Sequence, residues 1–513
     1  MSLLAKENLS IPGLYYDEAI FTGLAKDFLT GHIHGQHMPG YEVTQIFGSP
    51  FPIFVQSYLG ALKSWMLMPS FRLFGYSVAV LRSANLFWGL VSLLFFILGT
   101  WRWLGIRIAL IAGSLLALDS SYFFLCVLDW GAAVPSFLCR CLSFYLTVLW
   151  WRRRQAPYAF LAAFFSGLGF FNKIDFALLL VGVVVAGCLC FWRTLLALAK
   201  SSASATILAG VGFLVSAAPM LFKAPGILSF SASGMPPRAP GEFGEKLHTM
   251  SALYDGSYFY RLMNVGGVFE RMFSEPVHWL PIFGGCVLLA GIVCVAKNRW
   301  NASDGNGTRV GLFLVLSAVL VIFGVFLLPG AVRIHHAVLV YPLPHLIIAV
   351  ATVASWQRFS SIPKLRVLQA TICIALLALL VTQLLAIRRT QELIRETGGR
   401  GRWSESFDTF CRENKDRTDL TIASLDWGFN EQLIFLTDGP QLVEPFWRFG
   451  QDRPSLPTEP RYLFLVHPPE YSLFPFGVDY LKEAQAKGAE VDVHPYFDRQ
   501  DRVAFYTIQF RGH

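Results

Sequence analysis

Charged residues are scarce in this 513-residue sequence, at 15% of the chain, whereas 54% of its residues are hydrophobic. This composition excludes a disordered chain, and it contains more apolar surface than one or two soluble domains can bury. The nine cysteines form no dense cluster and no CxxC pair, so no disulfide framework is indicated. The sequence has no internal repeat, Walker loop or HExxH motif. The excess apolar surface is therefore expected to face lipid.

Long windows with few or no charges recur along the chain, each with about the length that a helix needs to cross a membrane. Three windows are less uniform, because one contains Asp119, one contains Arg140 and one follows the polar pair His335-His336. We expect about ten spans, at residues 83–100, 108–126, 130–151, 156–171, 176–192, 203–222, 279–296, 310–328, 337–354 and 367–387.

Basic residues are unevenly distributed over the short loops between these windows. One set of alternate loops contains 13 Lys and Arg residues, whereas the opposite set contains only Lys173 and Arg333. By the positive-inside rule, the first set is cytoplasmic and the second faces outward. The net charge of +8 is therefore a topology signal, and we expect membrane lipid and no nucleic acid as a partner. The arginines between 388 and 402 are interpreted as membrane-surface contacts.

The predicted fold class is mainly α: a polytopic helical membrane protein with a small C-terminal α/β domain outside the membrane. Residues 1–50 are expected to form an outer loop, and residues 51–77 an interfacial amphipathic helix. Residues 78–387 form the transmembrane domain, with a long outer loop at 223–278. Residues 388–513 form the soluble domain, because short alternating apolar runs there indicate strands and one stretch, near 477–488, indicates a helix.

Two acidic positions on the outward side are candidates for chemistry. Asp17-Glu18 follows a Pro-Gly turn at the start of a helical pattern, and Asp129 lies in the outer loop LCVLDWGAAVP. Each has a structural alternative, since Asp at a helix N-terminus accepts backbone N–H groups and Glu there favours the helix dipole. Taken one at a time, these residues are better explained by capping than by catalysis.

Several motifs follow one another in a distinctive order: Asp17-Glu18, FRLFG at 71–75, LRSANLFWG at 81–89, Asp129, and GLGFFNK at 167–173. This order resembles that of the GT-C glycosyltransferases of the protein-mannosyltransferase and aminoarabinose-transferase type, glycosyltransferase family 39 and its bacterial relatives. The resemblance covers roughly residues 14–190, and its motifs are more specific together than singly. It implies a helix ahead of the acidic loop, so we expect a further span upstream of Met1.

The resemblance implies a hexosyl or pentosyl transferase of the bacterial inner membrane and cell envelope, with its active site facing outward. Such enzymes take a polyprenyl-phosphate sugar as donor, and a carboxylate removes the proton of an acceptor hydroxyl or amine as C1 is inverted. Asp17 is the expected base. Glu18 and Asp129 are expected to orient the base or the acceptor, or to hold a divalent cation such as Mg or Mn. The acceptor is an unidentified glycan, lipid or protein.

The phosphate that leaves needs cationic partners more than a general acid. Arg333, His335 and His336 in the outer turn LPGAVRIHHAVLVYP are candidates, although a His pair at the mouth of a span can also be a polar terminus. Lys173 is a further candidate, whose alternative is an interfacial lysine that snorkels to the membrane surface.

Some residues depart from the family pattern or have a structural interpretation. Ile20 stands where aminoarabinose-type relatives have a basic residue, and Gly48-Ser49-Pro50 stands where they have Lys-Pro-Pro, so phosphate recognition must be arranged differently. Arg140, near the middle of a span, needs a partner, for which Asp119 or Asp175 is suitable. In the soluble domain, Asp426-Trp427-Gly428 indicates a strand-turn-helix junction, with acceptor binding as the alternative.

Two other classes of protein remain open at this point. A transporter or flippase of lipid-linked saccharide would also need polar groups along a lipid-facing groove, but such proteins commonly contain inverted repeats. A non-catalytic membrane scaffold would need no acidic pair.

The first testable prediction concerns topology. Residues 1–50 and 398–513 should lie on the same, outer side of the membrane, because the basic asymmetry orients the loops between them. Reporter fusions at residues 40 and 500 should therefore be active only with an extracytoplasmic reporter. Activity of a cytoplasmic reporter at residue 500 would contradict the ten-span arrangement.

Overall fold

The computed structural model describes residues 1–234, 242–266, 307–328, 332–360, 366–448, 459–474, 476–486 and 490–511. The chain divides into two compact units. Unit 1 contains Met1, Asn85–Tyr258 and Met272–Ile387, and unit 2 contains Ser2–Ala84, Phe259–Arg271 and Arg388–His513.

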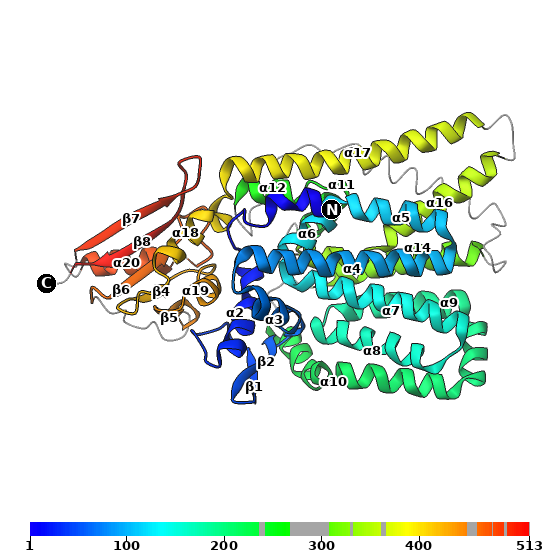
Figure 1. Cartoon of the computed structure of the whole chain (residues 1–513), viewed down its shortest axis with the longest axis horizontal. Coiled ribbons are helices and arrows are strands. Elements are labelled where there is room, and N and C mark those ends of the chain that lie inside the picture. Colours follow the sequence, from blue (N-terminus) through cyan, green and yellow to red (C-terminus); the bar gives the residue numbers. More distant parts are fainter. Residues whose placement is uncertain are drawn as a thin grey trace. The chain divides into compact units, whose positions relative to one another are not determined.

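The described part of unit 1 is helical, and most of its helices are long and apolar (Figure 1). They are α4 (Val78–Leu104, which begins in unit 2), α5 (Ile106–Leu118), α6 (Ser120–Leu128), α7 (Ala133–Arg153), α8 (Ala156–Asn172), α9 (Phe176–Ser201), α10 (Ala203–Gly234), α11 (Glu242–Asp255), α14 (Gly307–Leu327), α15 (Ile334–Ala337), α16 (Leu343–Ser360) and α17 (Arg366–Thr397, which ends in unit 2), with 3-10 turns η2 (Trp130–Ala132) and η3 (Val338–Val340).

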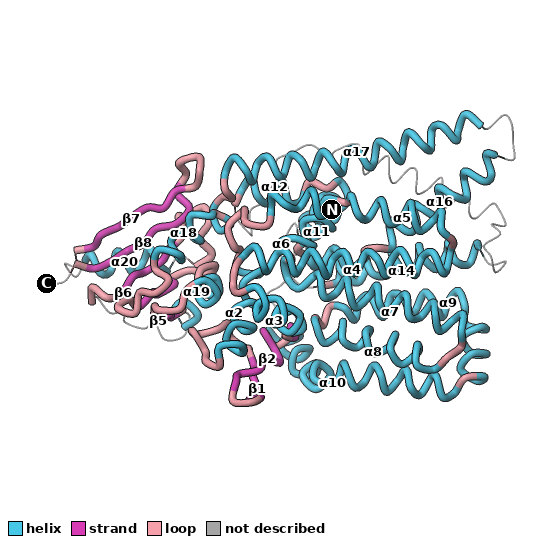
Figure 2. The backbone as a smooth tube through the Cα atoms, viewed as in Figure 1, coloured by secondary structure: helices cyan, strands magenta, loops and turns pink. Residues whose placement is uncertain are grey.

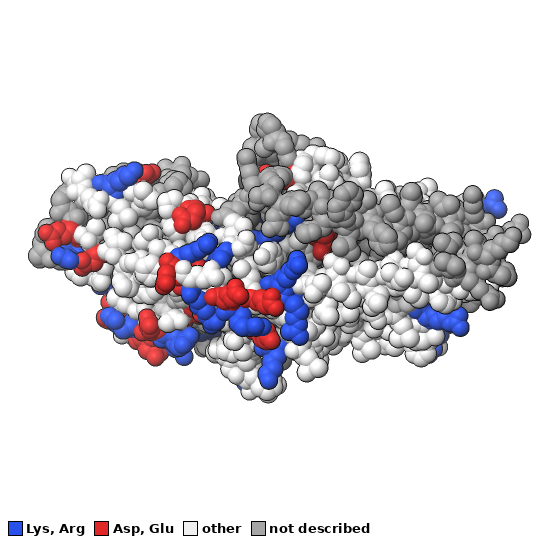
Figure 3. Space-filling model, turned by 90° about the horizontal axis from the view of Figure 1, so that it is seen from above, with Lys and Arg blue, Asp and Glu red and all other residues white. Residues whose placement is uncertain are grey.

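The helices of unit 1 make the chain a multi-pass membrane protein. Seven described helices are long and apolar enough to cross a membrane, or up to eight if the pair α5 and α6, bent by 62°, is one span. Most predicted windows coincide with one helix, but 108–126 is divided between α5 and α6, and 337–354 runs across α15, η3 and α16. The window 279–296 lies outside the described residues. In Figure 3 the helical part, on the right, is white over most of its described surface, with blue groups near its right-hand end.

The predicted outer loop at 223–278 is largely helical where it is described. Helix α10 continues to Gly234, α11 follows, and α12 spans Tyr258–Val265. Pro219 and Pro225 lie inside α10. These two prolines are compatible with helix, because helices in lipid tolerate proline when neighbouring groups satisfy the freed carbonyls. The run SGMPPRAPGEFG that suggested a loop lies mostly outside the described residues.

The N-terminal part of unit 2 differs from the predicted loop and amphipathic helix. It contains α1 (Ser2–Ala5), η1 (Lys6–Asn8), α2 (Tyr16–Thr30), an antiparallel sheet of β1 (Glu42–Ile46), β2 (Ser49–Gln56) and β3 (Leu59–Gly60), and α3 (Leu62–Phe74). The predicted helix thus begins only at Leu62. Pro50 and Pro52 explain the difference, because proline lacks the N–H that a helix needs and residues before it favour extended backbone.

The C-terminal part of unit 2 is the predicted α/β domain (Figure 2). Its sheet has the order β5-β4-β6-β8-β7, in which β4 is parallel to β5 and β6, and β8 is antiparallel to β6 and β7. The elements are η5 (Gly401–Trp403), α18 (Glu405–Glu413), β4 (Thr421–Ser424), α19 (Asn430–Leu436), β5 (Gln441–Val443), η6 (Pro445–Arg448), β6 (Tyr462–Val466), α20 (Phe476–Ala486), β7 (Val491–Phe497) and β8 (Val503–Phe510).

Apolar residues cover both faces of this sheet. Ile422 and Leu465 pack with Leu433 of α19 in one cluster, whereas Ala423 and Phe464 belong to a second cluster. Successive residues of a strand point to opposite faces, so β4 and β6 each contribute to both clusters. Strands buried on both faces are typical of parallel pairs covered by helices.

Arg140 of α7 has partners other than the two carboxylates that we expected. Its guanidinium donates to the carbonyls of Val338, at 2.9 Å, and Tyr341, at 2.7 Å. The chain leaves helical geometry there because Pro342 has no N–H to offer, which frees carbonyls inside the membrane domain. Asp119 instead accepts from Tyr341 Oη, and Asp175 pairs with Lys173.

The second prediction concerns the segment ahead of α2. Gly13 donates its N–H to Trp403 O at 2.8 Å, and a Cβ at Gly13 would lie 2.3 Å from Ser404 O. Gly13→Ala should therefore destabilise the protein by about 1–3 kcal/mol through overpacking against backbone. Gly210→Ala is the matched control, because a Cβ there meets no atom within 4 Å. Equal apparent Tm values for the two purified variants would contradict the prediction.

Candidate functional site

The acidic pair lies in the first turn of α2. Tyr15 is the N-cap residue, so Asp17 and Glu18 are the second and third residues of the helix. Asp17 is partly exposed, whereas Tyr16 and Glu18 beside it are buried. Asp17 is therefore not the N-cap residue that we considered as its structural alternative. Its charge still interacts favourably with the helix dipole.

Glu18 is held inside unit 2 by Arg82. The Glu18 carboxylate accepts from Arg82 Nε at 3.0 Å and from Arg82 Nη2 at 2.9 Å, and it also accepts from Tyr15 N at 3.3 Å. Both charged side chains are fully buried. Arg82 donates further to the carbonyls of Pro12, at 2.7 Å, and Gly13, at 3.1 Å. Glu18 thus anchors the start of α2 and is already occupied by protein groups.

Residues of the C-terminal domain contact the backbone and rings just before Asp17. Leu14 N donates to the Asp408 carboxylate of α18 at 3.1 Å, and the Tyr15 ring stacks on Trp403 with centroids 4.1 Å apart. Tyr16 Oη donates to Glu444 Oε1 at 3.3 Å. Burial raises the pKa of Asp408 to about 7. The position of Asp17 therefore depends on residues about 400 positions later in the sequence.

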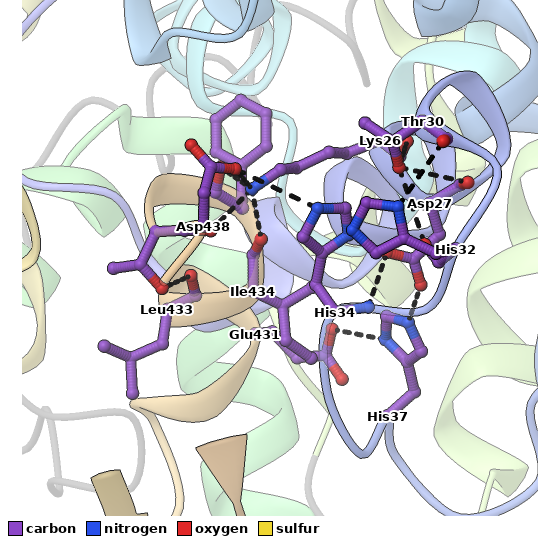
Figure 4. A network of polar contacts seen from close by, with 12 residues as sticks. Lys26, Asp27, Thr30, His32, His34, His37, Glu431, Leu433, Ile434 and Asp438 are labelled. Carbon is purple, nitrogen blue, oxygen red and sulfur yellow. Dashed lines mark hydrogen bonds and ion pairs between the residues drawn. The ribbon is translucent and has the colours of Figure 1, made fainter. Parts of the chain in front are cut away.

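A histidine-rich segment ties the far end of α2 to the same domain (Figure 4). His37 lies between two carboxylates, with Nε2 2.6 Å from Asp27 Oδ2 and Nδ1 3.2 Å from Glu431 Oε2. Burial alone would lower the pKa of His37, but the two carboxylates raise it to about 10. His37 is therefore a buried cation, and we call Asp27, His37 and Glu431 the histidine clamp.

Lys26 strengthens this attachment at the C-terminus of α19 (Figure 4). Its ammonium donates to the carbonyls of Ile434, at 3.0 Å, and Thr437, at 2.6 Å, and it lies 2.7 Å from Asp438 Oδ1. A cation at a helix C-terminus satisfies carbonyls that lack intrahelical partners. Sequence reasoning missed Lys26 and the histidine clamp, although the spacing HIHGQH at 32–37 was a visible signal.

In unit 1, Asp129 lies at the turn between α6 and α7. It is fully buried, adopts φ of +45°, and its Oδ1 accepts from Val134 N at 2.7 Å. The left-handed backbone is unusual for a residue other than glycine and is often found at functional turns. Asp129 is also the C-cap residue of α6, where a left-handed residue commonly ends a helix, so both its backbone and its side-chain contact have a capping role.

Lys173, Asp175 and His336 form a buried polar cluster in unit 1. Lys173 Nζ and His336 Nδ1 lie 2.9 Å and 2.8 Å from Asp175 Oδ2. Burial alone would raise the pKa of Asp175, but Lys173 and His336 lower it to about 2. Because only 7% of the Lys173 side chain is exposed, its ammonium does not snorkel to a surface.

The other residues of the outer turn lie near this cluster. Arg333 is the N-cap residue of α15, and the His335 ring packs edge-on against Trp130, with centroids 5.6 Å apart. Asn172 donates to Ala132 O at 3.2 Å, which joins the Lys173 segment to the turn after Asp129. The structure of unit 1 thus brings together four predicted residues, namely Asp129, Lys173, His335 and His336.

Two further expectations concern a metal and the Asp426 turn. Among the described residues, no three His, Cys, Asp or Glu side chains are arranged to hold a metal ion. Asp426 accepts backbone N–H groups of Trp427, at 2.8 Å, and Phe474, at 2.9 Å, and Gly428 has φ of +111°. The Asp426 turn therefore has the structural contacts of a strand-turn-helix junction.

Comparisons with known proteins identify the fold. No family model matches the sequence, and no curated protein gives a significant match. The structure is similar to that of ArnT from Cupriavidus metallidurans in the apo state, with a TM-score of 0.57, 12% identity, and coverage of 99% of this chain and 96% of that chain. ArnT bound to undecaprenyl phosphate gives the same TM-score and coverage at 13% identity.

The likeness to ArnT, a GT-C aminoarabinose transferase, confirms the predicted fold class. It spans both units, the helical membrane domain and the small C-terminal α/β domain. At such low identity a shared fold does not by itself establish a shared reaction.

The third prediction concerns Glu444, which is buried beside Tyr16. Burial and the Glu431 charge raise the pKa of Glu444 from 4.5 to about 8. An acid whose pKa is raised on folding contributes stability that is fully present below pH 4.5 and is lost as the pH rises through about 8. Glu444→Gln should therefore flatten the fall in apparent Tm between about pH 4.5 and pH 8, the interval in which only the folded state keeps the proton.

The substitution keeps the necessary hydrogen bonds, because the glutamine oxygen can accept from Trp447 while its amide donates to the Tyr16 hydroxyl. Glu459→Gln is the control, since Glu459 pairs with Arg461 at an exposed position. A Glu444→Gln profile parallel to that of the wild type would contradict the assignment.

Proposed function

We propose that this chain is a membrane glycosyltransferase that moves a sugar from a polyprenyl-phosphate donor to an acceptor hydroxyl or amine. The observation that supports this most directly is the fold shared with ArnT, one of whose structures holds undecaprenyl phosphate. The sequence motifs support the same reaction class, because the acidic pair, the two segments after it, Asp129 and GLGFFNK follow one another in the order found in GT-C enzymes. We place the reaction at the outer face of a bacterial inner membrane.

We propose Asp17 as the general base. It is the partly exposed member of the acidic pair, while the Glu18 carboxylate is occupied by Arg82. A carboxylate within hydrogen-bond reach of the acceptor would take its proton as the acceptor oxygen or nitrogen attacks C1, with inversion at that carbon. Glu18 then acts as a positioning residue, because its pairing with Arg82 anchors the turn that carries Asp17.

We propose that the cationic groups of the outer turn receive the leaving phosphate. Lys173, which lies 2.9 Å from Asp175, and Arg333 are the cationic side chains proposed for this role. Fixed cations stabilise the charge that develops on a leaving phosphate. Asp129, in its left-handed turn, is proposed to orient the acceptor.

The hairpin between β1 and β2 supports a different arrangement for the donor headgroup from that in aminoarabinose-type relatives. Phe47 and Gly48 form its two-residue turn, with φ of +53° and +79°, and Gly48 also begins the Gly48-Ser49-Pro50 segment that stands where those relatives have Lys-Pro-Pro. Two consecutive positive φ angles are typical of a type I′ turn. No basic residue occupies this turn, so we propose that the donor sugar differs from that of the aminoarabinose-type enzymes.

The fourth prediction tests the base. Asp17→Asn keeps the size of the side chain but cannot accept a proton at neutral pH, so transfer should fall by roughly a hundredfold to ten-thousandfold. Loss of the charge at the second position of α2 should cost about 0.3–1 kcal/mol of charge-dipole energy. The measurement is transfer from radiolabelled polyprenyl-phosphate sugars by the purified protein.

Asp129→Asn is the matched comparison and should lose less activity if Asp129 only orients the acceptor. Wild-type turnover in a folded Asp17→Asn protein would remove the assignment of the base. If the wild type moves labelled donor across vesicles without forming a product, the chain is a transporter of lipid-linked saccharide.

A further inference from the structure

Unit 1 contains a groove between α5, α16 and α17, with a volume of about 480 Å³. Its walls are apolar, with Leu110 and Ile111 from α5, Val353 from α16, and Ile372 and Leu376 from α17. All of these residues lie near the start of α5, the end of α16 and the start of α17. The groove therefore lies at the N-terminal end of α5, whereas Asp119 and α6 follow its C-terminal end.

The surroundings of this groove are membrane. Helices α16 and α17 lie within candidate spans, and α5 belongs to the bent pair. The walls include Leu110, of which 56% is exposed, and Trp356, of which 40% is exposed, so the described part of the chain leaves them uncovered. Apolar side chains that are uncovered within the hydrocarbon region contact lipid tails. The occupant expected on chemical grounds is therefore an acyl chain.

One charged residue lines the groove. Arg107 is the second residue of α5 and is exposed, and Gln357 lies beside the same groove near the end of α16. Arginine presents a planar fork of donors that matches a phosphate, and an amide can add a further hydrogen bond. A basic pocket between membrane helices is a typical site for an anionic lipid headgroup.

The surface near this groove also has the character of a membrane interface. The guanidinium of Arg102, at the end of α4 and five residues before Arg107, lies 5.4 Å from the Trp101 ring. Tryptophan and arginine gather where membrane helices reach the headgroups. Arg107, five residues from Arg102, is therefore at headgroup level, with the apolar walls extending toward the membrane centre.

From this geometry we infer that the groove binds an anionic glycerophospholipid, with one acyl chain along Leu110, Val353 and Leu376 and its phosphate on Arg107. The groove would hold a resident lipid between α17 and the helices α5 and α16. This inference is independent of the proposed glycosyl transfer. It concerns a different part of unit 1 from the turn that contains His335 and His336.

Two cysteines of the protein can report on lipid binding at this groove, one as the probe and the other as the control. Cys373 lines the groove, and Cys188 is an exposed cysteine of α9 outside it. The full-length protein is stripped of lipid in detergent and titrated with phosphatidylglycerol or phosphatidylcholine. Alkylation of each cysteine by N-ethylmaleimide is followed by peptide mass spectrometry. Each rate is compared with the rate of the same cysteine without lipid.

Phosphatidylglycerol should slow the alkylation of Cys373 about tenfold when its concentration is about ten times Kd, and should leave Cys188 unchanged. It should bind about fivefold more tightly than phosphatidylcholine, which is the preference expected from one arginine near a membrane surface. Equal protection of both cysteines, or none at Cys373, would overturn the inference. Protection of Cys373 by undecaprenyl phosphate alone would also overturn it.

Two variants distinguish the contribution of the lipid headgroup to binding from that of the acyl chain. Arg107→Gln should remove the preference for phosphatidylglycerol but leave binding of the acyl chain intact. Thr352→Trp should fill the groove and abolish binding of both lipids. Arg153→Gln is the control for charge, because Arg153 donates to Tyr158 Oη at 2.8 Å and does not line the groove. An unchanged lipid preference in folded Arg107→Gln protein would overturn the assignment of the phosphate.

Discussion

The buried ion pair between Arg82 and Glu18 is the interaction on which the acidic helix depends. Removing two charges from water is costly, and the cost is offset only when every polar atom of the pair has a partner. Arg82 meets this condition by binding both oxygens of Glu18 and the carbonyls of Pro12 and Gly13. Because these partners come from the segment before α2, the pair fixes the path of the chain into the helix. As a consequence of that path, Asp17 lies in the first turn of α2.

The C-terminal domain is a structural part of unit 2 and not an appendage to it. It contacts the start of α2 through Asp408 and Trp403, and the other end of the helix through Glu431 of the histidine clamp. The clamp places a buried imidazolium between two carboxylates, which favours one arrangement of α2 on α19 over any slipped alternative, because a shift would leave buried charge without a partner. A change in the domain can therefore alter the surroundings of Asp17 without contacting it.

In unit 1, polar groups occur where helices break. Asp119 lies at the bend between α5 and α6 and binds Tyr341 Oη at 2.9 Å, and Arg140 binds the carbonyls that precede Pro342. Irregular backbone at membrane depth is tolerated only when protein groups satisfy it. These contacts hold the short helix α15, whose residue His336 pairs with Asp175. Asp119 and Arg140 are charged residues that would be energetically costly in a membrane span. In this structure they support the turn that contains the candidate phosphate-binding residues.

Hydropathy determined the membrane helices from the sequence alone, because a span must be apolar over its whole length whatever it packs against. Alternation likewise revealed β4, β6, β7 and β8, whereas the order of motifs suggested Asp17, Asp129 and Lys173 as site residues without indicating their surroundings. Only the tertiary structure decided that residues 49–56 form a strand, that Arg140 binds carbonyls, and that Glu18 pairs with Arg82 while Asp17 remains partly exposed. These outcomes depend on contacts between residues far apart in the chain, and the free energy of such contacts is not encoded in any local window.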